Sequence, residues 1–547
     1  MAQGERKSLG GHLGYVASTY PHNPFFISNQ EKLTYQAFNQ GVDRLAKGLL
    51  KLGIQKGDKV SLWMPNRLNW LYAQFAIARI GAILVPISTR FKTMETEYIL
   101  KQSDTSTLIM VDKFLNVDFL AMLQEICPEI GVNKAGNIQS SQFPYLKNVI
   151  VDSKRAYAGT FKYEELWDWG ASSGDDEKLR KAQSLVGPDD IAVIAYTSGT
   201  TGSPKGAMLA HDSISRHLRF VSESIGLEEK DRVLFGFPLY HLGGSVTAVM
   251  PPLLTGACLL TTEYFDPEEA MRTIEREKCT TFFGVHTMVQ MIIEHPNFGK
   301  YNLKSLKKGL IGGAACPTKL IEDIIAKLNY TPLNFYGMTE CATCTTGTPK
   351  YSTPHQIATT IGKAGDDYEI KVADSKTGED VPAGEVGELC VRGYIVMKGY
   401  YKKPEETAKV FDKDGWFHTG DLVKMDEKGY LTFMGRSKDI IISGGENIDP
   451  IEVENFLSRH PKVLKAEVIG VPDRRLNEVV MAFIALKRGK EAQEEEIKAF
   501  CKGKIASFKI PKYIRFIDYQ DFPTTSFGKV QKFKLREMAI KGLGLKD

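Results

Sequence analysis

Apolar runs of strand length alternate with stretches of helical period along most of this chain, and this alternation limits the folds that it can adopt. Residues 34–52 carry apolar side chains at steps of four and three and end at Gly53, which is the pattern of an amphipathic helix followed by a stop signal. Apolar runs at 59–64 and 82–87 indicate buried strands, and residues 70–80 between them indicate a helix. Strands that alternate with helices are typical of parallel sheets covered by helices, so we predict an α/β fold.

The middle of the chain repeats this pattern, and a later segment departs from it. We expect strands at 190–196, 280–285 and 308–312 and a helix at 267–278. Between about 355 and 436 the pattern changes to short β-like runs broken by glycine. This change predicts a β-rich subdomain in that segment.

The length of 547 residues is enough for several domain-sized units. We place the main boundary at Arg436 to Lys438, where the β-rich pattern gives way to a compact mixture of strand and helix signals. The prediction is a large N-terminal domain (1–436) of parallel-rich sheets with helices plus the β-rich subdomain, residues 437–438 as the connection, and a small α+β domain (439–547).

Charge differs between the two predicted domains. The whole chain has a net charge of +4, but residues 437–547 contain 21 basic and 16 acidic residues, so the preceding part is slightly acidic. A basic module suits closure over an anionic ligand, although a solvated basic surface has the same balance. The composition, 43% hydrophobic and 25% charged, excludes wholesale disorder and a histone-like polycation. Charge alone leaves nucleic acid open as a partner; we predict none.

The cysteines and the polar N-terminus favour a cytoplasmic protein. The eight cysteines show no spacing typical of a disulfide framework, which favours reduced thiols. Cys341 and Cys344 form a C-x-x-C pair, but no second pair or His doublet completes a structural zinc site. The N-terminus lacks the apolar core of a signal peptide, and the least polar stretch (247–260) is shorter than the ~20 residues that span a bilayer. We therefore expect no integral membrane segment.

The segment 196–211 has the composition of a phosphate-binding loop and follows a predicted strand. It supplies glycines that admit close backbone approach, hydroxyl donors and one ammonium group: Gly199, Gly202, Gly206, Ser198, Thr200, Thr201 and Lys205. No Walker A register passes through Lys205, which disfavours a P-loop NTPase. An ordinary Ser/Thr/Gly turn between a strand and a helix is the structural alternative.

This segment resembles the nucleotide loop of the adenylate-forming superfamily, which includes acyl-CoA synthetases, peptide-synthetase adenylation domains and luciferases. Further motifs follow in the order of that family, from about Leu33 to Lys534. The resemblance implies ATP and a carboxylic acid as substrates, Mg²⁺ as cofactor and CoA as cosubstrate. It also implies a small C-terminal domain that moves as a lid, and it leaves a homodimer open.

The segment 334–340, Asn-Phe-Tyr-Gly-Met-Thr-Glu, resembles the family motif whose aromatic ring stacks on adenine and whose Thr-Glu pair faces phosphate and Mg²⁺. A carboxylate is the hard oxygen ligand that Mg²⁺ prefers, so Glu340 and Thr200 are the implied metal ligands. The small residues of 312–315 resemble the stretch that lets adenine and the acyl group approach the backbone. The implied nucleotide-binding residues are Thr197, Ser198, Gly199, Thr200, Thr201, Gly202, Gly313, Ala314, Ala315, Asn334, Tyr336, Gly337, Thr339, Asp421 and Arg436.

Later motifs complete the resemblance. The sequence His418-Thr-Gly-Asp421 resembles the motif whose Asp accepts hydrogen bonds from the ribose hydroxyls, and Arg436 resembles its partner near the ribose or phosphate. Lys438 stands where the family has its hinge residue, and the loop of Ser443, Gly444, Gly445 and Glu446 resembles the one that lines the pantetheine tunnel of CoA.

The segment 523–529 resembles the final family motif, whose lysine enters the site as the adenylate forms. Phe527 departs from the smaller residue that is common there, while Gly528 and Lys529 are retained. Preorganised positive charge at the developing phosphorane favours the transition state. The implied catalytic residues are Lys529, Thr339, Glu340 and Lys205.

The acyl pocket is expected from segments that are apolar and contain no obvious Lys or Arg for a second carboxylate. The implied acyl-binding residues are His241, Val285, Gly313 and Met338. His241 matches an aromatic gate, and a buried histidine held by backbone is the alternative. We expect an AMP-forming acid–CoA ligase for a medium-length, branched or cyclic monocarboxylic acid.

Four alternatives remain at this point: an aryl acid–CoA ligase, a stand-alone adenylation enzyme that loads a carrier protein, a luciferase-like oxygenase and a non-catalytic binding module. The Gly-Gly-Glu-Asn loop at 444–447 favours CoA, and the retention of Lys529 and Glu340 argues against a binding module. A serine hydrolase is disfavoured, because the segment 243–247 fails the Gly-x-Ser-x-Gly pattern at its last position.

Overall fold

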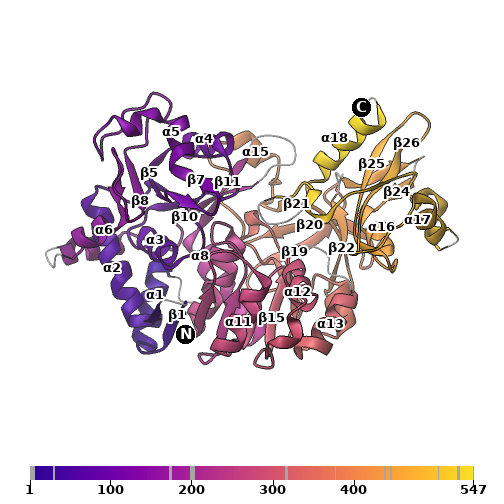
Figure 1. Cartoon of the computed structure of the whole chain (residues 1–547), viewed down its shortest axis with the longest axis horizontal. Helices are drawn as coiled ribbons and strands as arrows, with labels where there is room; N and C mark the ends of the chain where they lie inside the picture. The colour runs from indigo at the N-terminus through magenta and orange to yellow at the C-terminus, as the bar shows by residue number, and fades with distance from the viewer. Residues whose placement is uncertain are drawn as a thin grey trace. The chain divides into compact units, whose positions relative to one another are not determined.

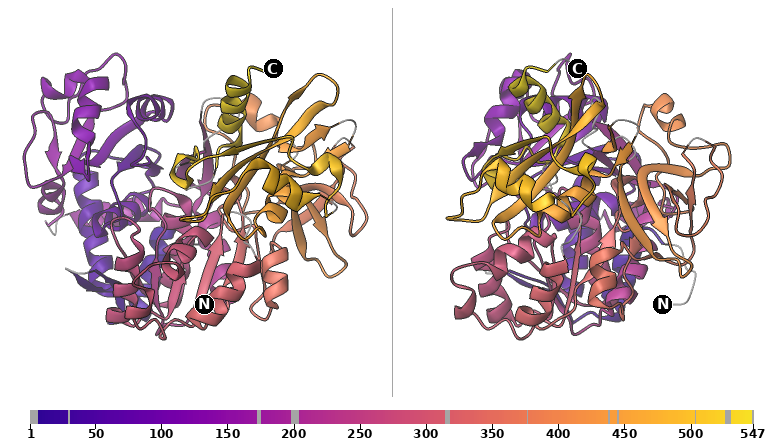
Figure 2. Two further views of the ribbon diagram at one scale, coloured as in Figure 1. Left: turned by 45° about the vertical axis from the view of Figure 1, so that its right-hand side comes forward. Right: turned by 90° about the vertical axis from the view of Figure 1, so that its right-hand side faces the viewer.

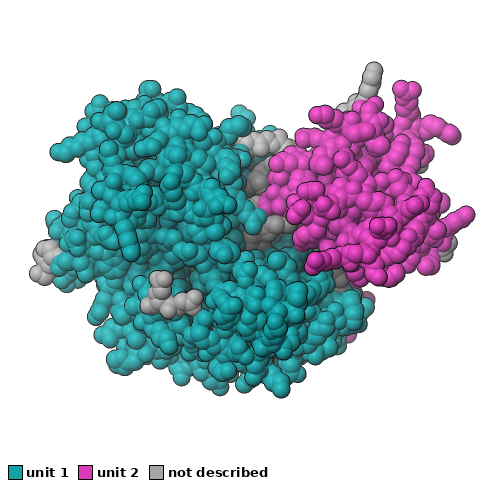
Figure 3. Space-filling model, viewed as in Figure 1, with its two compact units in different colours: residues 1–357, 364–369, 392–411 teal, residues 358–363, 370–391, 412–547 magenta. Residues whose placement is uncertain are grey.

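The computed structural model describes most of the chain and contains two compact units (Figure 3). The described residues are 7–28, 31–171, 175–197, 204–313, 318–375, 377–436, 439–443, 446–502, 504–525 and 530–545, and of residues 217, 218, 446 and 447 only the backbone is described. Unit 1 comprises residues 1–357, 364–369 and 392–411, and unit 2 comprises residues 358–363, 370–391 and 412–547. The predicted α/β architecture is confirmed, because parallel strands and helices alternate throughout unit 1.

One sheet of unit 1 has a parallel centre and an antiparallel edge. Its order is β11 (Lys205–Ala210), β10 (Ile191–Thr197), β4 (Ile83–Pro86), β3 (Lys59–Trp63), β5 (Thr105–Val111), β8 (Asn148–Asp152) and β9 (Phe161–Lys162). The strands from β10 to β9 pair in parallel, and β11 pairs antiparallel to β10. The central strands are almost wholly buried, which explains their continuous apolar runs.

The second sheet of unit 1 carries the segments that build the candidate site. Its order is β18 (Lys363–Ala364), β17 (Thr346–Gly347), β16 (Leu333–Tyr336), β15 (Lys308–Gly312), β14 (Thr281–Phe283), β12 (Arg232–Phe235), β13 (Cys258–Thr261), β1 (Pro24–Ile27) and β2 (Lys32–Thr34). All pairs from β16 to β1 are parallel, and the pairs β17–β16 and β1–β2 are antiparallel. The carboxyl ends of β12, β14, β15 and β16 therefore lie at one edge of this sheet.

Amphipathic helices cover these sheets (Figure 1). Helix α2 (Tyr35–Lys51) begins where Thr34 Oγ1 accepts a hydrogen bond from the N–H of Ala37, and it buries Phe38 and Leu45, as its period predicts. The other helices before residue 412 are α1 (Leu9–Thr19), α3 (Leu68–Arg79), α4 (Thr93–Gln102), α5 (Phe119–Ile126), α6 (Tyr163–Trp169), α7 (Asp176–Ser184), α8 (His211–Ser215), α9 (His217–Ile225), α10 (Met250–Thr255), α11 (Pro267–Glu277), α12 (His286–Ile293), α13 (Thr318–Leu328), α14 (Pro354–Thr359) and α15 (Pro404–Ala408). Each helix in the described part of the chain is too short or too polar to traverse a bilayer.

Unit 2 contains an antiparallel sheet and a compact C-terminal module (Figure 2). The antiparallel sheet has the order β19 (Glu369–Ala373), β20 (Val386–Arg392), β21 (Phe417–Met425) and β22 (Leu431–Arg436). The module contains β23 (Ile441–Ser443), β24 (Glu446–Ile448), β25 (Val463–Asp473), β26 (Asn477–Leu486), β27 (Tyr513–Phe516), α16 (Pro450–Leu457), α17 (Glu494–Cys501) and α18 (Lys532–Leu543). The predicted β-rich segment and the predicted α+β segment are thus both present.

Both faces of the long β25–β26 hairpin are buried. Val468 and Val480 belong to a core that includes α16 and α17, while Ile469 and Met481 belong to another core that includes α18. Neighbouring residues of a strand point to opposite faces, so one hairpin supports both cores. The module therefore has its own apolar core on each side of the hairpin.

The contact-defined units do not coincide with the predicted domains. The β-rich segment belongs mainly to unit 2, whereas the sequence analysis assigned it to the large N-terminal domain. Residues 437 and 438 lie outside the described residues, so the predicted boundary there stays a prediction.

The first testable prediction concerns His211, a fully buried residue of α8 whose Nδ1 accepts the backbone N–H of Leu9 at 3.3 Å. Burial lowers the pKa of His211 to about 4 from 6.5. Between these two pH values the unfolded chain binds a proton at His211, and the folded chain does not. Stability is therefore lost as the pH falls from 6.5 towards 4, and at pH 5 the loss from this residue is about 2 kcal/mol.

Urea denaturation of the unchanged protein and of His211→Gln, at pH 7 and at pH 5, checks this expectation. The difference in unfolding free energy between the two pH values should shrink by about 2 kcal/mol in His211→Gln. The exposed His22 provides the control, since His22→Gln should keep the full pH dependence. An unchanged pH dependence in His211→Gln would contradict the prediction.

Candidate active site

The predicted acyl- and nucleotide-binding residues of unit 1 follow the carboxyl ends of parallel strands. His241 lies in the segment after β12, Val285 immediately precedes α12 after β14, Gly313 follows β15, and Tyr336 ends β16. Ligands of open α/β sheets bind at this edge because the loops there surround a crevice. The fold therefore brings together residues that are distant in the sequence.

The loop after β16 is tightly folded and positions Glu340. Gly337 has no room for a side chain, since a Cβ there would lie 1.1 Å from the carbonyl oxygen of Thr343. The carbonyl oxygen of Met338 accepts hydrogen bonds from the backbone N–H groups of Cys341 (3.2 Å) and Thr343 (3.0 Å). Glycine at 337 is thus required by the close return of the chain, and the predicted residues Met338, Thr339 and Glu340 occupy this half-buried loop.

The segment after β12 is clamped by a residue that the sequence analysis missed. The buried side chain of Asn66 donates to the carbonyl oxygen of Phe237 at 2.9 Å and accepts from the backbone N–H of Leu239 at 2.7 Å. Asparagine suits this position because its amide offers a donor and an acceptor together. A lone Asn between a strand and a helix gives no sequence signal of such a role.

His241 lies on this clamped segment, directly before the π-helix Gly243–Ala248. Its Nδ1 accepts the backbone N–H of Gly243 at 3.0 Å, and burial lowers its pKa to about 4. The hydrogen bond between His241 and Gly243 agrees with the alternative that the sequence left open, a histidine held by the backbone. Thr247, in the π-helix, donates to the Oγ1 of Thr343 at 2.6 Å and so joins this segment to the loop of Glu340.

Lys205, Glu406, Tyr400 and Glu340 form a connected polar cluster in unit 1. The Lys205 ammonium pairs with Glu406 at 2.6 Å and lies 5.2 Å from the ring centre of Tyr400, whose hydroxyl donates to Glu340 at 3.0 Å. The hydrogen bond from Lys205 is the largest factor that lowers the pKa of Glu406 to about 2. Burial and the nearby Glu340 carboxylate raise the pKa of Tyr400. This cluster joins two predicted catalytic residues, Lys205 and Glu340, through Tyr400.

The predicted phosphate-loop segment continues as a strand. Lys205 begins β11, which pairs antiparallel with β10, and Thr197 stands opposite Lys205 in this ladder. Within the described residues, this segment leads from one strand into another strand and not into a helix. Gly206 lies within β11, and residues 198–202, with the predicted metal ligand Thr200, lie outside the described residues.

The chain between residues 396 and 401 lies beside β11, and this pairing brings Tyr400 to the polar cluster. The N–H of Met208 donates to the carbonyl oxygen of Gly399 at 3.0 Å, and the N–H of Tyr401 donates to that of Gly206 at 2.8 Å. These backbone bonds place Tyr400 opposite Ala207. The sequence analysis missed Tyr400 and Glu406, because both reach Lys205 through tertiary pairing.

Asn334 has a structural use in this site. Its side chain is buried, and Nδ2 donates to the carbonyl oxygen of Ile357 at 3.3 Å. The adjacent Tyr336 is half-buried, and its carbonyl oxygen accepts the N–H of Thr345 at 2.7 Å. Tyr336 and Gly313 lie at the carboxyl edge of the sheet, and the predicted residues Ala314 and Ala315 lie outside the described residues.

Asp421 and Arg436 lie together in unit 2, as the resemblance implies. They pair across β21 and β22, and the Nε of Arg436 is 3.0 Å from the Oδ1 of Asp421. Asp421 is buried. This pair gives the β-rich sheet one anionic and one cationic group at the same point.

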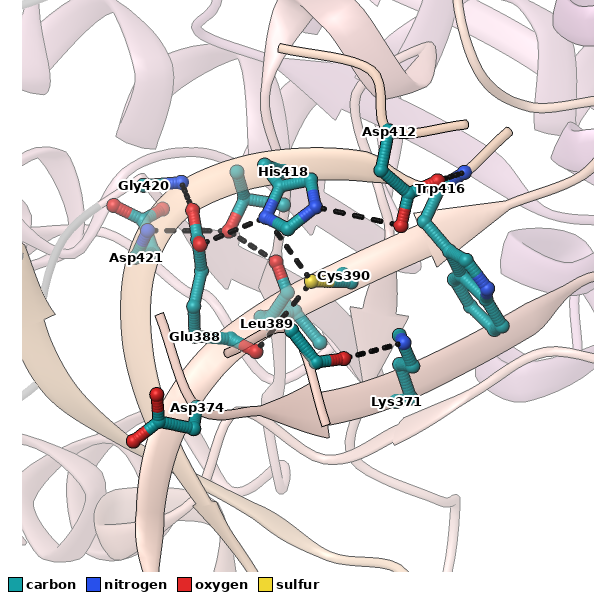
Figure 4. Close-up of polar contacts among 12 residues, drawn as sticks. Lys371, Asp374, Glu388, Leu389, Cys390, Asp412, Trp416, His418, Gly420 and Asp421 are labelled. Atoms are coloured by element: carbon teal, nitrogen blue, oxygen red, sulfur yellow. Dashed lines mark hydrogen bonds and ion pairs between the residues drawn. The ribbon is translucent and has the colours of Figure 1, made fainter. Parts of the chain in front are cut away.

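Asp421 lies in a bulge of β21 that Glu388 braces (Figure 4). In the pairing of β20 with β21, Glu388 stands opposite Leu422 and Cys390 stands opposite His418. The residues of β21 between His418 and Leu422 therefore bulge out opposite a single residue of β20. Gly420 has a φ of 72°, a left-handed conformation that favours glycine, and its N–H donates to the Oε1 of Glu388 at 2.8 Å. The sequence analysis missed Glu388, although the bulge that it braces carries the predicted ribose ligand.

The remaining predicted residues belong to the C-terminal module. Ser443 and Glu446 pair across the β23–β24 hairpin, whose turn residues Gly444 and Gly445 lie outside the described residues. Thr524 pairs with Val530 across the segment that carries Lys529. Lys529 and Lys438 also lie outside the described residues, so no position is given for them.

Comparisons with known proteins identify the family. The model described as AMP-binding enzyme matches residues 14–401, and that described as AMP-binding enzyme C-terminal domain matches residues 452–529. The chain belongs to the AMP-binding enzyme family.

Two of the similar proteins have full-length matches. Medium-chain acyl-CoA ligase ACSF2, mitochondrial, of Bos taurus is 38% identical over 548 residues, covering 98% of this chain and 88% of that protein. The protein of the same name from Danio rerio is 40% identical over 526 residues, covering 95% and 86%. The crystal structure of the anthranilate CoA ligase AuaEII in complex with anthranoyl-AMP matches with a TM-score of 0.86 at 26% identity, covering 99% of this chain and 98% of that one.

The second prediction concerns Tyr400. In Tyr400→Phe the Glu340 carboxylate loses its hydrogen bond from the phenol, and a hydrogen bond to a charged group contributes about 1.5 to 3 kcal/mol. We expect the affinity for Mg·ATP to fall about tenfold, since 1.4 kcal/mol corresponds to a factor of ten. Isothermal titration calorimetry measures it.

Tyr401→Phe is the matched control, because the neighbouring Tyr401 hydroxyl donates to the Asp104 carboxylate at 2.8 Å. Both variants lose one phenol–carboxylate bond, but only the first touches Glu340. Equal weakening of Mg·ATP binding in both variants would show that Glu340 has no special part in nucleotide binding.

Proposed function

We propose that this chain is an ATP-dependent, AMP-forming ligase that activates a medium-length, branched or cyclic monocarboxylic acid and transfers it to CoA. The observation that carries the proposal is the cluster in which Tyr400 connects Lys205 with Glu340, close to the end of the strand that precedes the phosphate-loop segment. It combines an ammonium group, which can contact phosphate oxygens, with a carboxylate, which can ligate the cation that accompanies a nucleotide triphosphate. The full-length similarity to acyl-CoA ligases supports the same function.

In the first half-reaction, a carboxylate oxygen of the acid attacks the α-phosphorus of ATP. The bond between the α-phosphorus and the bridging oxygen breaks, and pyrophosphate leaves with its electron pair. Lys205 and Lys529 would offset the charge that develops on the phosphate oxygens. An ionised acid needs no general base, so His241, whose ring is held by the N–H of Gly243, has a positioning role in this proposal.

Glu340 fits the role of Mg²⁺ ligand in this half-reaction. Its carboxylate is a hard oxygen donor whose orientation is set by the hydroxyl of Tyr400. Thr200 would add a hydroxyl oxygen. When bound, Mg²⁺ neutralises phosphate charge and thereby favours departure of pyrophosphate.

In the second half-reaction, the sulfur of CoA attacks the carbonyl carbon of the adenylate, and AMP leaves with the bridging oxygen. The loop of Ser443, Gly444, Gly445 and Glu446 would line the path of the pantetheine arm. A rotation about Lys438 would exchange this loop for Lys529 at the site. The separate cores of the C-terminal module support such an independent movement.

The proposed acid is a monocarboxylic acid with an apolar body. Val285 and Met338, at the edge where His241 also lies, are apolar, and relatives in the full-length comparison are named medium-chain acyl-CoA ligases. An aryl acid is the second candidate, because a structural neighbour is named an anthranilate CoA ligase.

Two finer points of the proposal concern the acceptor and the assembly. Free CoA is the proposed acceptor. If a carrier protein is the acceptor instead, the acyl group would be transferred only to a phosphopantetheinylated protein.

We propose a cytoplasmic enzyme, and a homodimer is compatible with this proposal. Light scattering of the purified chain gives the mass that decides between a monomer and a dimer.

The third prediction tests the two half-reactions. Lys529→Ala should lower acid-dependent pyrophosphate exchange at least about a hundredfold, since an oriented charge at the transition state contributes that much. Thioester formation from supplied acyl-AMP and CoA should stay nearly unchanged. Lys534→Ala, on the exposed side of α18, is the control and should retain both rates. Equal loss of both half-reactions in Lys529→Ala would contradict the model of two domain positions.

The fourth prediction concerns the substrate. With ATP, Mg²⁺ and CoA, straight-chain acids of graded length should give the highest kcat/KM at medium length, with branched and alicyclic acids next. The release of AMP and the consumption of free CoA should be equal in amount. A higher kcat/KM for benzoate-like acids than for every aliphatic acid would replace the proposed substrate by the aryl class.

A further inference from the structure

Three side chains with metal-ligating atoms meet between β20 and β21, beside the bulge that contains Asp421. Glu388 and Cys390 are two residues apart on β20 and therefore share a face, and His418 stands opposite Cys390 in the ladder. A carboxylate oxygen, a thiol sulfur and an imidazole nitrogen from these residues all lie within 4.8 Å of one another. Among the described residues, this is the one group of at least three Cys, His, Asp or Glu with such spacing.

The distances in this group are close to those of a tetrahedral cation site. His418 Nδ1 lies 2.9 Å from Glu388 Oε2 and 3.6 Å from Cys390 Sγ. With metal–ligand bonds of about 2.0 to 2.3 Å in tetrahedral geometry, neighbouring nitrogen and sulfur ligands are about 3.5 Å apart and nitrogen and oxygen ligands about 3.3 Å. The nitrogen–sulfur distance already matches this geometry, and the nitrogen–oxygen distance would match after the carboxylate oxygen moves by about half an ångström.

The surroundings of the group orient its members, as Figure 4 shows. The second ring nitrogen of His418, Nε2, faces Asp412 Oδ2 at 3.6 Å. Asp412 is itself fixed by the backbone N–H groups of Asp414 and Trp416, both 2.9 Å from Oδ1. A carboxylate behind a ligating imidazole fixes the tautomer that leaves the other nitrogen free for a cation. Glu388 is held in turn by the N–H of Gly420.

We propose that Glu388, Cys390 and His418 form a binding site for a thiophilic divalent cation of the zinc class. A mixed oxygen, nitrogen and sulfur donor set suits Zn²⁺, whereas Mg²⁺ prefers oxygen donors alone. This site is distinct from the proposed Mg²⁺ ligand, Glu340, which lies in unit 1. The fourth position would be taken by water or another small ligand.

Each proton that the cation displaces has an acceptor. The buried Cys390 thiol, whose pKa burial raises to about 12, gives its proton to solvent as the sulfur–metal bond forms. The cation takes the place of the proton on His418 Nδ1, next to Glu388, and this proton moves to Nε2, which faces Asp412, so the imidazole stays neutral. The two negative charges of thiolate and carboxylate then neutralise the divalent cation.

An occupied site would couple the cation to the nucleotide-binding motif. His418 and Leu422 flank the bulge, Asp421 lies within it, and Glu388 accepts the N–H of Gly420 there. A bond from the cation to Glu388 and His418 would tie β20 to β21 on both sides of this bulge. The position of Asp421 would thereby become less mobile.

The experiment uses the full-length protein, treated with a chelator and dialysed, without ATP. Cobalt(II) chloride is titrated in as a spectroscopic probe of the zinc class. We expect one equivalent of Co²⁺ to bind with visible bands typical of a four-coordinate site and a near-ultraviolet thiolate-to-cobalt charge-transfer band, and Zn²⁺ to displace both. Absence of the charge-transfer band in the unchanged protein would overturn the proposal.

Matched cysteine variants locate the site. Cys390→Ala should lose the charge-transfer band, whereas Cys501→Ala, at a buried cysteine of α17 in the same unit, should retain it. His418→Gln and Asp412→Asn serve if Cys390→Ala does not fold: the first should weaken Co²⁺ binding at least tenfold, and the second, which acts through the imidazole, about tenfold. A band that persists in Cys390→Ala, or unchanged affinity in His418→Gln, would show that the Glu388–His418 contact is only a hydrogen bond that braces the bulge.

Discussion

The parallel pairing of β12, β14, β15 and β16 is the constraint on which the candidate active site depends. Because these strands run in one direction, their following loops meet at one edge of the sheet although they are far apart in the sequence. Side-chain hydrogen bonds then join the loops, as Asn66 does for the segment after β12. The site is therefore built on rigid strands, and its loops are fixed by buried polar contacts.

The charge of Lys205 in the polar cluster of unit 1 is compensated by Glu406, whereas the carboxylate of Glu340 accepts a hydrogen bond from the neutral phenol of Tyr400. A triphosphate that reaches Lys205 would compete with Glu406 for the same ammonium group. The cluster would therefore favour ligands with enough negative charge to replace a carboxylate over neutral molecules.

The regular elements could be predicted from the sequence, whereas the contacts that join them could not. The helix at 34–52 and the strand at 308–312 follow from local apolar period, and the structure has them as α2 and β15. The pairing of Asp421 with Arg436 was implied by motif order. Tyr400 and Glu406 were missed because their relation to Lys205 depends on the backbone pairing of residues 399–401 with β11, which no local pattern records. The strand after the phosphate-loop segment was missed for the same reason.

The two compact units are interleaved along the chain. Residues 364–369 and 392–411 belong to unit 1 although the segments around them belong to unit 2, so the backbone passes between the units at five points. No single proteolytic cut can release either unit whole. An exchange of unit 2 between two members of this family would accordingly require several joined crossovers, and a fragment that begins at residue 412 would lack β19 and β20, of which β20 pairs with β21, the strand of Asp421.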